Sequence, residues 1–201
     1  MGKIFCFIGK SSSGKDTIFR ALSEEFKDIM EIIPYTTRPI REGEIDGITY
    51  NFVSNEVYEE MLTNNLVIES RSYNTVHGIW TYFTAATNID LEHNSYMNIN
   101  TLIGYQELKR YYGEDKVVPI YIQVEDGIRL QRALDREKTE QKPKYKELCR
   151  RFLADQEDFS EENLMIAGIN KIYINDDLFG CIHQISSDMN GYLEKEKQYR
   201  I

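Results

Sequence analysis

Compact apolar runs alternate along the chain with segments in which apolar residues recur every three or four positions. The compact runs predict buried strands, at residues 4–8, 30–33, 66–69, 95–100, 117–124 and 171–178. The helical spacing predicts helices, at residues 18–26, 55–62, 103–112 and 129–136, with further helices opening near residues 150 and 178. Residues 81–94 are predicted to form a helix that leads into a turn. Alternating strands and helices indicate an α/β fold with a central parallel sheet flanked by helices.

Composition narrows the class of protein. The 201 residues, 41% of them hydrophobic, suffice for one α/β domain with a core of ordinary size. A formal charge of −9 and a pI near 5.0 argue against a nucleic-acid polymer as partner, because such binders carry a basic surface. No apolar run reaches the roughly 20 residues that span a membrane, so no membrane partner is expected. Three cysteines (Cys6, Cys149 and Cys181) without metal-ligand spacing fit a reducing cytoplasm.

A glycine-rich stretch lies between the first predicted strand and the first predicted helix. It reads Gly9-Lys10-Ser11-Ser12-Ser13-Gly14-Lys15-Asp16-Thr17. This is the context of a phosphate-binding P-loop, the Walker A motif. The glycines leave the backbone open to a phosphate, and the loop N–H groups and the positive helix end attract the anion. The stretch is the candidate ATP-binding loop, and Lys15, which can reach the β- and γ-phosphates, is a candidate catalytic residue.

One position departs from the Walker A pattern, in which a Ser or Thr after the lysine offers its hydroxyl to Mg²⁺. Asp16 occupies that position, and Thr17 comes next. A carboxylate also binds Mg²⁺, directly or through water, and the metal would offset its repulsion of the phosphates. Asp16 is therefore the candidate metal-binding residue, and Mg²⁺ with ATP is the expected cofactor.

A second cluster of phosphate-binding side chains lies in residues 34–54. Arg38 and Arg41 are three residues apart, and Tyr50 follows a turn marked by glycine. Two guanidinium groups and a phenol suit a single phosphate. On spacing alone, a loop with solvated charges is the simpler interpretation, and both remain open at this point.

The order of residues in this segment resembles guanylate kinases. Their pattern T-T-R-x-x-R-x-G-E-x-x-G-x-x-Y-x-F-V-S matches TTRPIREGEIDGITYNFVS at residues 36–54. The resemblance implies that Arg38, Arg41 and Tyr50 hold the phosphate of GMP, and that Arg38 bridges to the transferred phosphoryl group. It also implies that Glu44 braces the two arginines.

The resemblance assigns guanine recognition to Glu69, at the F-x-E position of the family. Its carboxylate would accept hydrogen bonds from N1–H and the 2-amino group, which adenine does not offer in that arrangement. Three positions depart from the family. Pro34 replaces a serine that contacts guanine O6, His77 takes the place of a tyrosine, and Ile79 takes the place of a hydroxyl residue. His77 stays a candidate GMP-binding residue, whereas Pro34 and Ile79 put guanine selectivity in question.

Two further segments carry the resemblance with different strength. The family has two aspartates near metal and substrate, where this chain has Asn98 and Asn100. Near the end of the chain, residues 171–178 closely match the family's I-x-N-D-D-L, which implies that Asn175 lies beside the adenine of ATP. An Asn-Asp turn that caps the final helix is the alternative.

Arginines at helical spacing follow the strand at residues 117–124. Arg132 and Arg136 lie one turn apart on one helix face, and Arg151 opens the return helix after a polar stretch at residues 137–146. A solvated helical hairpin would explain this pattern. The resemblance implies a lid whose three arginines close over the ATP phosphates and act in catalysis.

The resemblance spans roughly residues 3–190 and implies a P-loop NTPase fold in a single guanylate kinase-like domain over residues 1–201. The expected parts are a core (1–33, 85–131 and 151–193), an inserted monophosphate-binding subdomain (34–84) and a lid (132–150). The expected reaction is ATP + GMP giving ADP + GDP, by a monomer or homodimer. The alternatives are a kinase of the same fold for another nucleotide, a catalytically degenerate binding module, and a P-loop NTPase switch.

Overall fold

In the computed structural model, which describes residues 2–75 and 78–198, the centre of the molecule is a five-stranded sheet in the order β2-β7-β1-β8-β9. All neighbours in this sheet pair in parallel. The strands are β1 (Ile4–Ile8), β2 (Ile29–Glu31), β7 (Ser95–Ile99), β8 (Val117–Gln123) and β9 (Ile172–Ile174). The predicted α/β fold with a central parallel sheet is confirmed.

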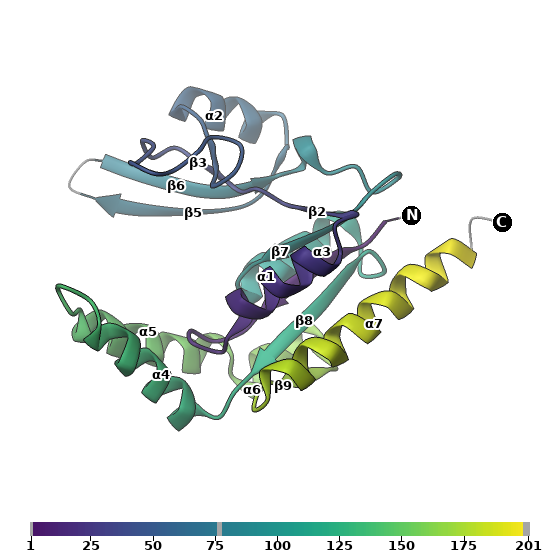
Figure 1. Cartoon of the computed structure of the whole chain (residues 1–201). Coiled ribbons are helices and arrows are strands. Elements are labelled where there is room, and N and C mark those ends of the chain that lie inside the picture. The colour runs from purple at the N-terminus through teal and green to yellow at the C-terminus, as the bar shows by residue number, and fades with distance from the viewer. Residues whose placement is uncertain (1, 76–77, 199–201) are drawn as a thin grey trace.

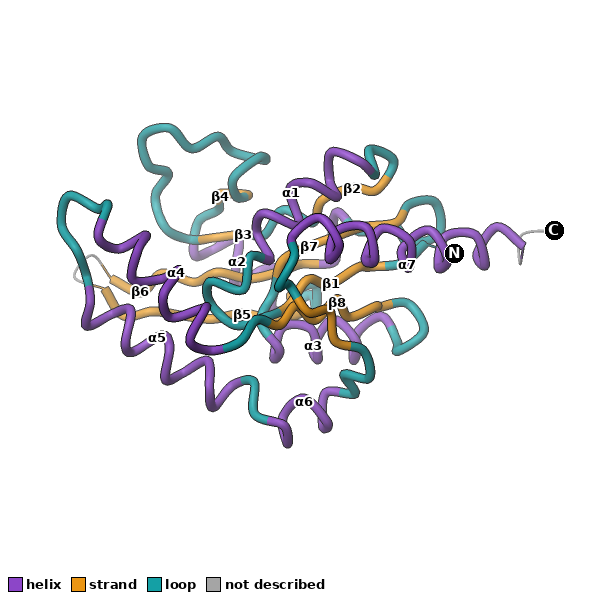
Figure 2. Tube along the Cα trace, turned by 60° about the horizontal axis from the view of Figure 1, so that its bottom comes forward, coloured by secondary structure: helices purple, strands orange, loops and turns teal. Residues whose placement is uncertain are grey.

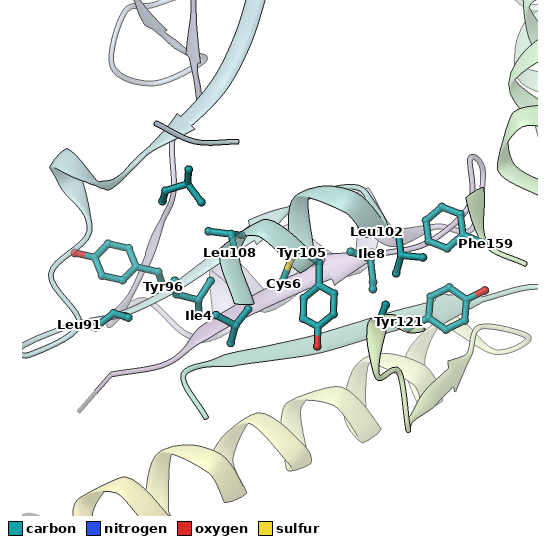
Figure 3. Packing of buried hydrophobic residues seen from close by; sticks show 13 residues of the cluster. Ile4, Cys6, Ile8, Leu91, Tyr96, Leu102, Tyr105, Leu108, Tyr121 and Phe159 are labelled. Carbon is teal, nitrogen blue, oxygen red and sulfur yellow. The ribbon is translucent and has the colours of Figure 1, made fainter. Parts of the chain in front are cut away.

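Helices cover both faces of this sheet (Figures 1 and 2). Side chains of β1 alternate between the faces: Ile4, Cys6 and Ile8 join one buried cluster, and Phe5 and Phe7 join the other. Figure 3 shows the first cluster, where strand residues meet those of α3. The helices are α3 (Leu102–Tyr112) and α6 (Glu161–Ala167) on the first face and α1 (Lys15–Glu25) and α7 (Leu178–Gln198) on the second. Burial on both faces explains why β1 is apolar throughout.

A second, smaller sheet has the order β4-β3-β6-β5. Its strands are β3 (Tyr35–Thr36), β4 (Asn51–Phe52), β5 (Val67–Thr75) and β6 (Gly78–Ala85). The helix α2 (Asn55–Thr63) packs on it through a separate cluster that includes Tyr35, Met61 and Phe83. This sheet therefore has a hydrophobic core of its own.

The helix predicted for residues 81–94 is wrong. Residues up to Ala85 belong to β6, which pairs antiparallel with β5, and only the short 3-10 helix η1 (Ala86–Asn88) follows. Thr81 and Phe83 are buried while Tyr82 between them is partly exposed. That alternation, with aromatic and β-branched residues, suits a strand. Pairing with the long strand β5 makes this segment a strand and not a helix.

Other local predictions hold. Ser54 caps α2, with its hydroxyl accepting a hydrogen bond from the N–H of Val57 at 3.4 Å. Gly113 ends α3 as predicted. Cys6 is a fully buried core residue, and burial raises the pKa of its thiol. The strand expected at residues 66–69 is present as β5, which extends further than expected, to Thr75.

The loop between β1 and α1 lies between two projecting parts of the molecule (Figure 1). One is the second sheet, and the other is a hairpin of α4 (Asp126–Lys138) and α5 (Tyr145–Asp158). Within the described ranges, no helix is long and apolar enough to cross a bilayer.

Candidate active site

The glycine-rich loop turns sharply into α1 at Gly14. This residue is the N-cap, with a left-handed φ of 85°. A Cβ there would lie 2.4 Å from Nδ2 of Asn175. Glycine thus meets both a backbone and a space requirement, and it lets Lys15 begin the helix directly beside the loop.

A cavity of about 500 Å³ lies between this loop and the α4–α5 hairpin. Its lining combines loop residues with three arginines of the hairpin: Ser11, Ser12, Gly14, Lys15, Asp16, Thr17, Arg132, Arg136 and Arg151. Nη2 of Arg136 is 3.5 Å from the Ser12 hydroxyl. Nε of Arg151 is buried and makes no hydrogen bond within residues 2–75 and 78–198. Four cationic side chains around a glycine-rich loop suit a polyphosphate.

Two candidate ATP-binding residues, Lys10 and Asn175, have protein partners and do not line that cavity. Nζ of Lys10 contacts Gln156 and lies 3.5 Å from the Asp126 carboxylate. Nδ2 of Asn175 donates to the Ser13 carbonyl at 2.8 Å, so this asparagine supports the loop backbone. Gly9, the first residue of the loop, has a φ of 158°.

Arg129, which the motifs did not single out, ties the loop to the hairpin. Its guanidinium is buried and donates to the carbonyl of Ser11 at 2.9 Å and to the Asp155 carboxylate at 3.1 Å. Nε and Nη2 donate to Asp126 at 3.0 and 2.9 Å. Asp155 also accepts from the N–H of Ser11 at 2.8 Å. Burial raises the pKa of Asp126, but hydrogen bonds from Gln156 and Arg129 outweigh it and lower this pKa overall.

A second cavity, of about 300 Å³, separates the two sheets. Its lining comes from both: Lys15, Ile32, Pro34, Tyr50, Glu69, Arg71, Tyr73, Tyr82, Phe83, Thr84, Asn98, Ile99, Asn100 and Thr101. Lys15 lines this cavity and the polyphosphate-sized one as well. The two cavities therefore adjoin at Lys15.

Glu69 stands in the inter-sheet cavity with two neighbours. Thr84 donates its hydroxyl hydrogen to Oε1 of Glu69 at 2.9 Å. Nη2 of Arg71 lies 3.6 Å from Oε2. These contacts orient a carboxylate that can accept two parallel N–H groups from a ligand.

Arg38 is buried in the second sheet and paired with Glu44. Its Nη1 and Nη2 donate to the two carboxylate oxygens at 2.7 and 2.5 Å, and its Nε donates to the Tyr82 hydroxyl at 3.0 Å. Hydrogen bonds from Arg38 lower the pKa of Glu44 to about 2, and the same bonds raise the pKa of Arg38.

Arg41 and Tyr50 lie around this pair. The Arg38 guanidinium carbon is 5.3 Å from the Tyr50 ring centre, and Tyr50 faces the inter-sheet cavity. Burial raises the pKa of the Tyr50 phenol, which keeps it a hydrogen-bond donor. Arg41 lies over Trp80 at 5.7 Å, and its backbone N–H donates to Glu44 at 2.8 Å. His77 lies outside the described residues.

The positions that depart from the family pattern have distinct environments. Pro34 lines the inter-sheet cavity, whereas Ile79 is 59% exposed. Oδ1 of Asn98 is buried and has no hydrogen-bond partner in the described part of the chain. Oδ1 of Asn100 accepts from the N–H of Thr101 at 2.8 Å and from Arg71 at 3.3 Å.

Oxygen donors suitable for Mg²⁺ lie on both sides of Lys15. Asp16 is largely exposed, with its carboxylate 3.7 Å from Nζ of Lys15, and Asn98, whose buried Oδ1 has no partner among the described residues, lines the cavity that Lys15 also lines. Carboxylate and amide oxygens are hard donors that fit Mg²⁺. No group of three or more His, Cys, Asp or Glu side chains in the described ranges is arranged to hold a metal.

Sequence reasoning missed Arg71, Tyr82 and Thr84 in the inter-sheet cavity. Arg71 could have been predicted from the sequence, because side chains two positions apart on a strand share a face and Glu69 was already a candidate. Tyr82 and Thr84 could not have been predicted in the same way, since their segment was expected to be helical.

Known proteins resemble this chain in sequence and in fold. A family model described as guanylate kinase matches residues 1–186. The chain is 28% identical to a guanylate kinase of Caldanaerobacter subterraneus over 185 residues, which cover 92% of this chain and 84% of that protein. A guanylate kinase of Chlorobium luteolum is 41% identical over 69 residues, which span only 34% of this chain and 35% of the relative. The crystal structure of guanylate kinase from Anaplasma phagocytophilum superposes with a TM-score of 0.60 at 21% identity, covering 94% of this chain and 85% of that one, which shows a common fold.

Proposed function

Since the chain belongs to the guanylate kinase family, we propose that it transfers the γ-phosphoryl group of ATP to GMP, giving ADP and GDP. The observation that carries this proposal is the position of Lys15 in the lining of both cavities. A donor polyphosphate in one cavity and an acceptor monophosphate in the other would meet at its ammonium group. Phosphoryl transfer demands in-line positioning and charge neutralisation, and a shared cation serves both.

The donor phosphates would lie on the loop N–H groups, with Lys15 at the β/γ end. Arg132, Arg136 and Arg151 approach from the hairpin and would spread their charge over the transferred group. We propose that residues 132–150 act as a lid that excludes water and suppresses ATP hydrolysis. Mg²⁺, held by the phosphates with Asp16 and Asn98 as protein oxygen donors, would neutralise phosphate charge.

Residues 34–84 would form the subdomain that binds the monophosphate. Arg41 and the phenol of Tyr50 would hold the GMP phosphate, with Arg38 positioned by Glu44 beside them. Glu69, oriented by Thr84, would accept the N1–H and 2-amino hydrogens of guanine. His77 belongs to the proposed set by motif position. No general base is needed, because the acceptor phosphate is already an anion.

A kinase of the same fold for another nucleoside monophosphate is the second candidate, because Pro34 places a residue without a donor in the base cavity. A binding module without catalysis is disfavoured, since Gly14 and Lys15 are present and shape a phosphate-sized loop.

A coupled assay of ADP release with Mg-ATP and a panel of GMP, dGMP, IMP, AMP, UMP and CMP tests the proposal. Lys15→Ala and Arg41→Ala are the informative variants, and Lys27→Ala, an exposed lysine after α1, is the matched control. We expect GMP to be the best acceptor, with turnover lost in both variants and kept in the control. Best turnover with another monophosphate would replace the substrate, and GMP binding in calorimetry without turnover would favour the binding module.

A further inference from the structure

Arg71 places a guanidinium group next to the carboxylate of Glu69. The two residues are two positions apart on β5, so their side chains share the strand face that lines the inter-sheet cavity. Nη2 of Arg71 is 3.6 Å from Oε2 of Glu69. A bound base would therefore meet an acceptor group and a donor group side by side along one edge.

The Nη2 nitrogen of Arg71, which is the one near Glu69, is also anchored to residues outside β5. Nη2 donates to Oδ1 of Asn100 at 3.3 Å and to the hydroxyl of Thr101, the N-cap of α3. Nε and Nη1 make no hydrogen bond to any residue that the structure describes. An arginine has five N–H groups in a rigid planar fork, and Nη1 and Nη2 each carry two of them. One N–H of Nη2 can therefore stay anchored while the other, in parallel with an N–H of Nη1, is available to a ligand.

The cavity lining includes other donors, among them Tyr73 and Asn98, but two positions that carry a donor in the family pattern lack one in this chain. Pro34 has no N–H and no side-chain donor, and Ile79 is aliphatic and 59% exposed. A buried acceptor without a partner is costly. A guanine held by Glu69 through N1–H and the 2-amino group would present O6 and N7 next along its edge. A donor beside Glu69 would then be the group that these two acceptors meet.

We propose that Arg71 is a specificity-determining residue that donates hydrogen bonds to O6 and N7 of the acceptor guanine. This inference rests on the proposed function, in which GMP is the acceptor. Arginine pairs with O6 and N7 of guanine through two parallel hydrogen bonds, and four consecutive groups of the base would then be matched by Glu69 and Arg71. Adenine in the same pose would set its amino group against the guanidinium and its unprotonated N1 against the carboxylate.

The test compares GMP with 7-deaza-GMP, which keeps O6, N1–H and the amino group but lacks the N7 acceptor. The kcat/KM of each is measured for the unmodified protein, Arg71→Ala and Arg71→Lys. Arg110→Ala is the matched control, because Arg110 pairs with Glu107 on the exposed side of α3. We expect a preference for GMP over 7-deaza-GMP in the unmodified protein and the control, a ratio near one in Arg71→Ala, and a loss of about 5- to 150-fold with GMP in that variant.

IMP and AMP separate the two halves of the recognition. IMP keeps O6 and N7 but lacks the 2-amino group, so turnover with IMP should fall in Arg71→Ala by a factor similar to that for GMP. The discrimination of GMP against AMP should also fall. Lysine keeps the charge without the planar fork, so Arg71→Lys should restore turnover only in part, and it carries the comparison if Arg71→Ala does not fold.

An equal loss with GMP and 7-deaza-GMP in Arg71→Ala, with their ratio unchanged, would overturn the inference, because Arg71 would then only tie β5 to α3. In that case GMP turnover by the unmodified protein would leave the proposed function intact. Best turnover with a different monophosphate, or neither turnover nor binding of GMP in calorimetry, would overturn both.

Discussion

The guanidinium of Arg38 and the carboxylate of Glu44 form two parallel hydrogen bonds of 2.7 and 2.5 Å. Arg38 is buried, so this pair holds a cation in place beneath Tyr50 at the proposed phosphate site. An arginine fixed in this way loses little conformational freedom when a phosphate binds. The pair is therefore a positioning device for the acceptor site.

Replacing Glu44 by glutamine should weaken GMP binding more than it slows turnover. The substitution removes charge-assisted hydrogen bonds and frees Arg38 to move. We expect the KM for GMP to rise about 10-fold or more, while the KM for ATP changes little. Steady-state kinetics with each substrate varied measures this. Glu42→Gln, two residues away, is the control, and an unchanged KM for GMP in Glu44→Gln would refute the positioning role.

Stability of the same pair should depend on pH with a defined sign. The pKa of Glu44 is lowered from its ordinary value of 4.5 to about 2 in the folded protein. Its contribution to the free energy of unfolding is therefore complete above about pH 4.5 and is lost as the pH falls toward 2. Denaturant unfolding of the unmodified protein and Glu44→Gln at stepped pH should show a difference that shrinks through this window. A constant difference would contradict the assignment.

Asp16 should set the magnesium dependence of the reaction. Asp16→Ala is expected to raise the Mg²⁺ concentration for half-maximal activity about 10-fold or more, whereas Asp16→Ser, which restores a hydroxyl, should change it less. Activity is measured across a magnesium titration at fixed ATP. Asp28→Ala, at an exposed position after α1, is the control. Identical titration curves for all variants would exclude a role for Asp16 at the metal.

Arg129 should contribute strongly to stability. Arg129→Met leaves the mostly buried Asp155 without its charge partner, and breaking a buried ion pair costs about 3–5 kcal/mol. For a protein of this size, we expect Tm to fall by about 6–20 °C. Arg150→Ala removes an exposed pair with Glu147 and should lower stability by less than about 1 kcal/mol. Equal effects of the two substitutions would show that the Arg129 network does not hold the loop.

Removing an arginine of the α4–α5 hairpin should lower kcat. Arg136→Ala is expected to lower kcat about 10²- to 10³-fold, because a preorganised donor near the transferred group is lost, with the KM for GMP nearly unchanged. Lys138→Ala, whose exposed side chain pairs with Asp135 on the same helix, is the control. Single-turnover kinetics would separate chemistry from product release. A normal single-turnover rate in Arg136→Ala would place Arg136 outside the reacting centre.

Features carried by neighbouring residues were readable from the sequence. The run at β1, the glycine-rich turn and the helix from Lys15 follow one another within 25 residues, and the structure has them as expected. The Ser54 cap and the Gly113 helix end are likewise local. Such features depend on backbone conformation and hydrogen bonds within a few residues, so they are visible without knowing the fold.

Contacts between residues that are far apart in the sequence could not be predicted from the sequence. Arg129 and Ser11 are 118 positions apart, yet the arginine holds the loop carbonyl. Arg71 is held in the inter-sheet cavity by hydrogen bonds to Asn100 and Thr101, which lie about 30 positions away in the sequence. The segment at β6 was predicted as a helix, and antiparallel pairing with β5 makes it a strand.

By itself, the sequence determined the α/β class, the glycine-rich loop with its candidate residue Lys15 and, through the resemblance to guanylate kinases, the candidate residues Glu44 and Glu69. Only the tertiary structure decided that Lys15 lines two cavities and that Arg71 stands beside Glu69. The physical reason is that local conformation follows short-range propensity and periodicity, whereas a binding site is a meeting of side chains whose elements are brought together by burial of the core.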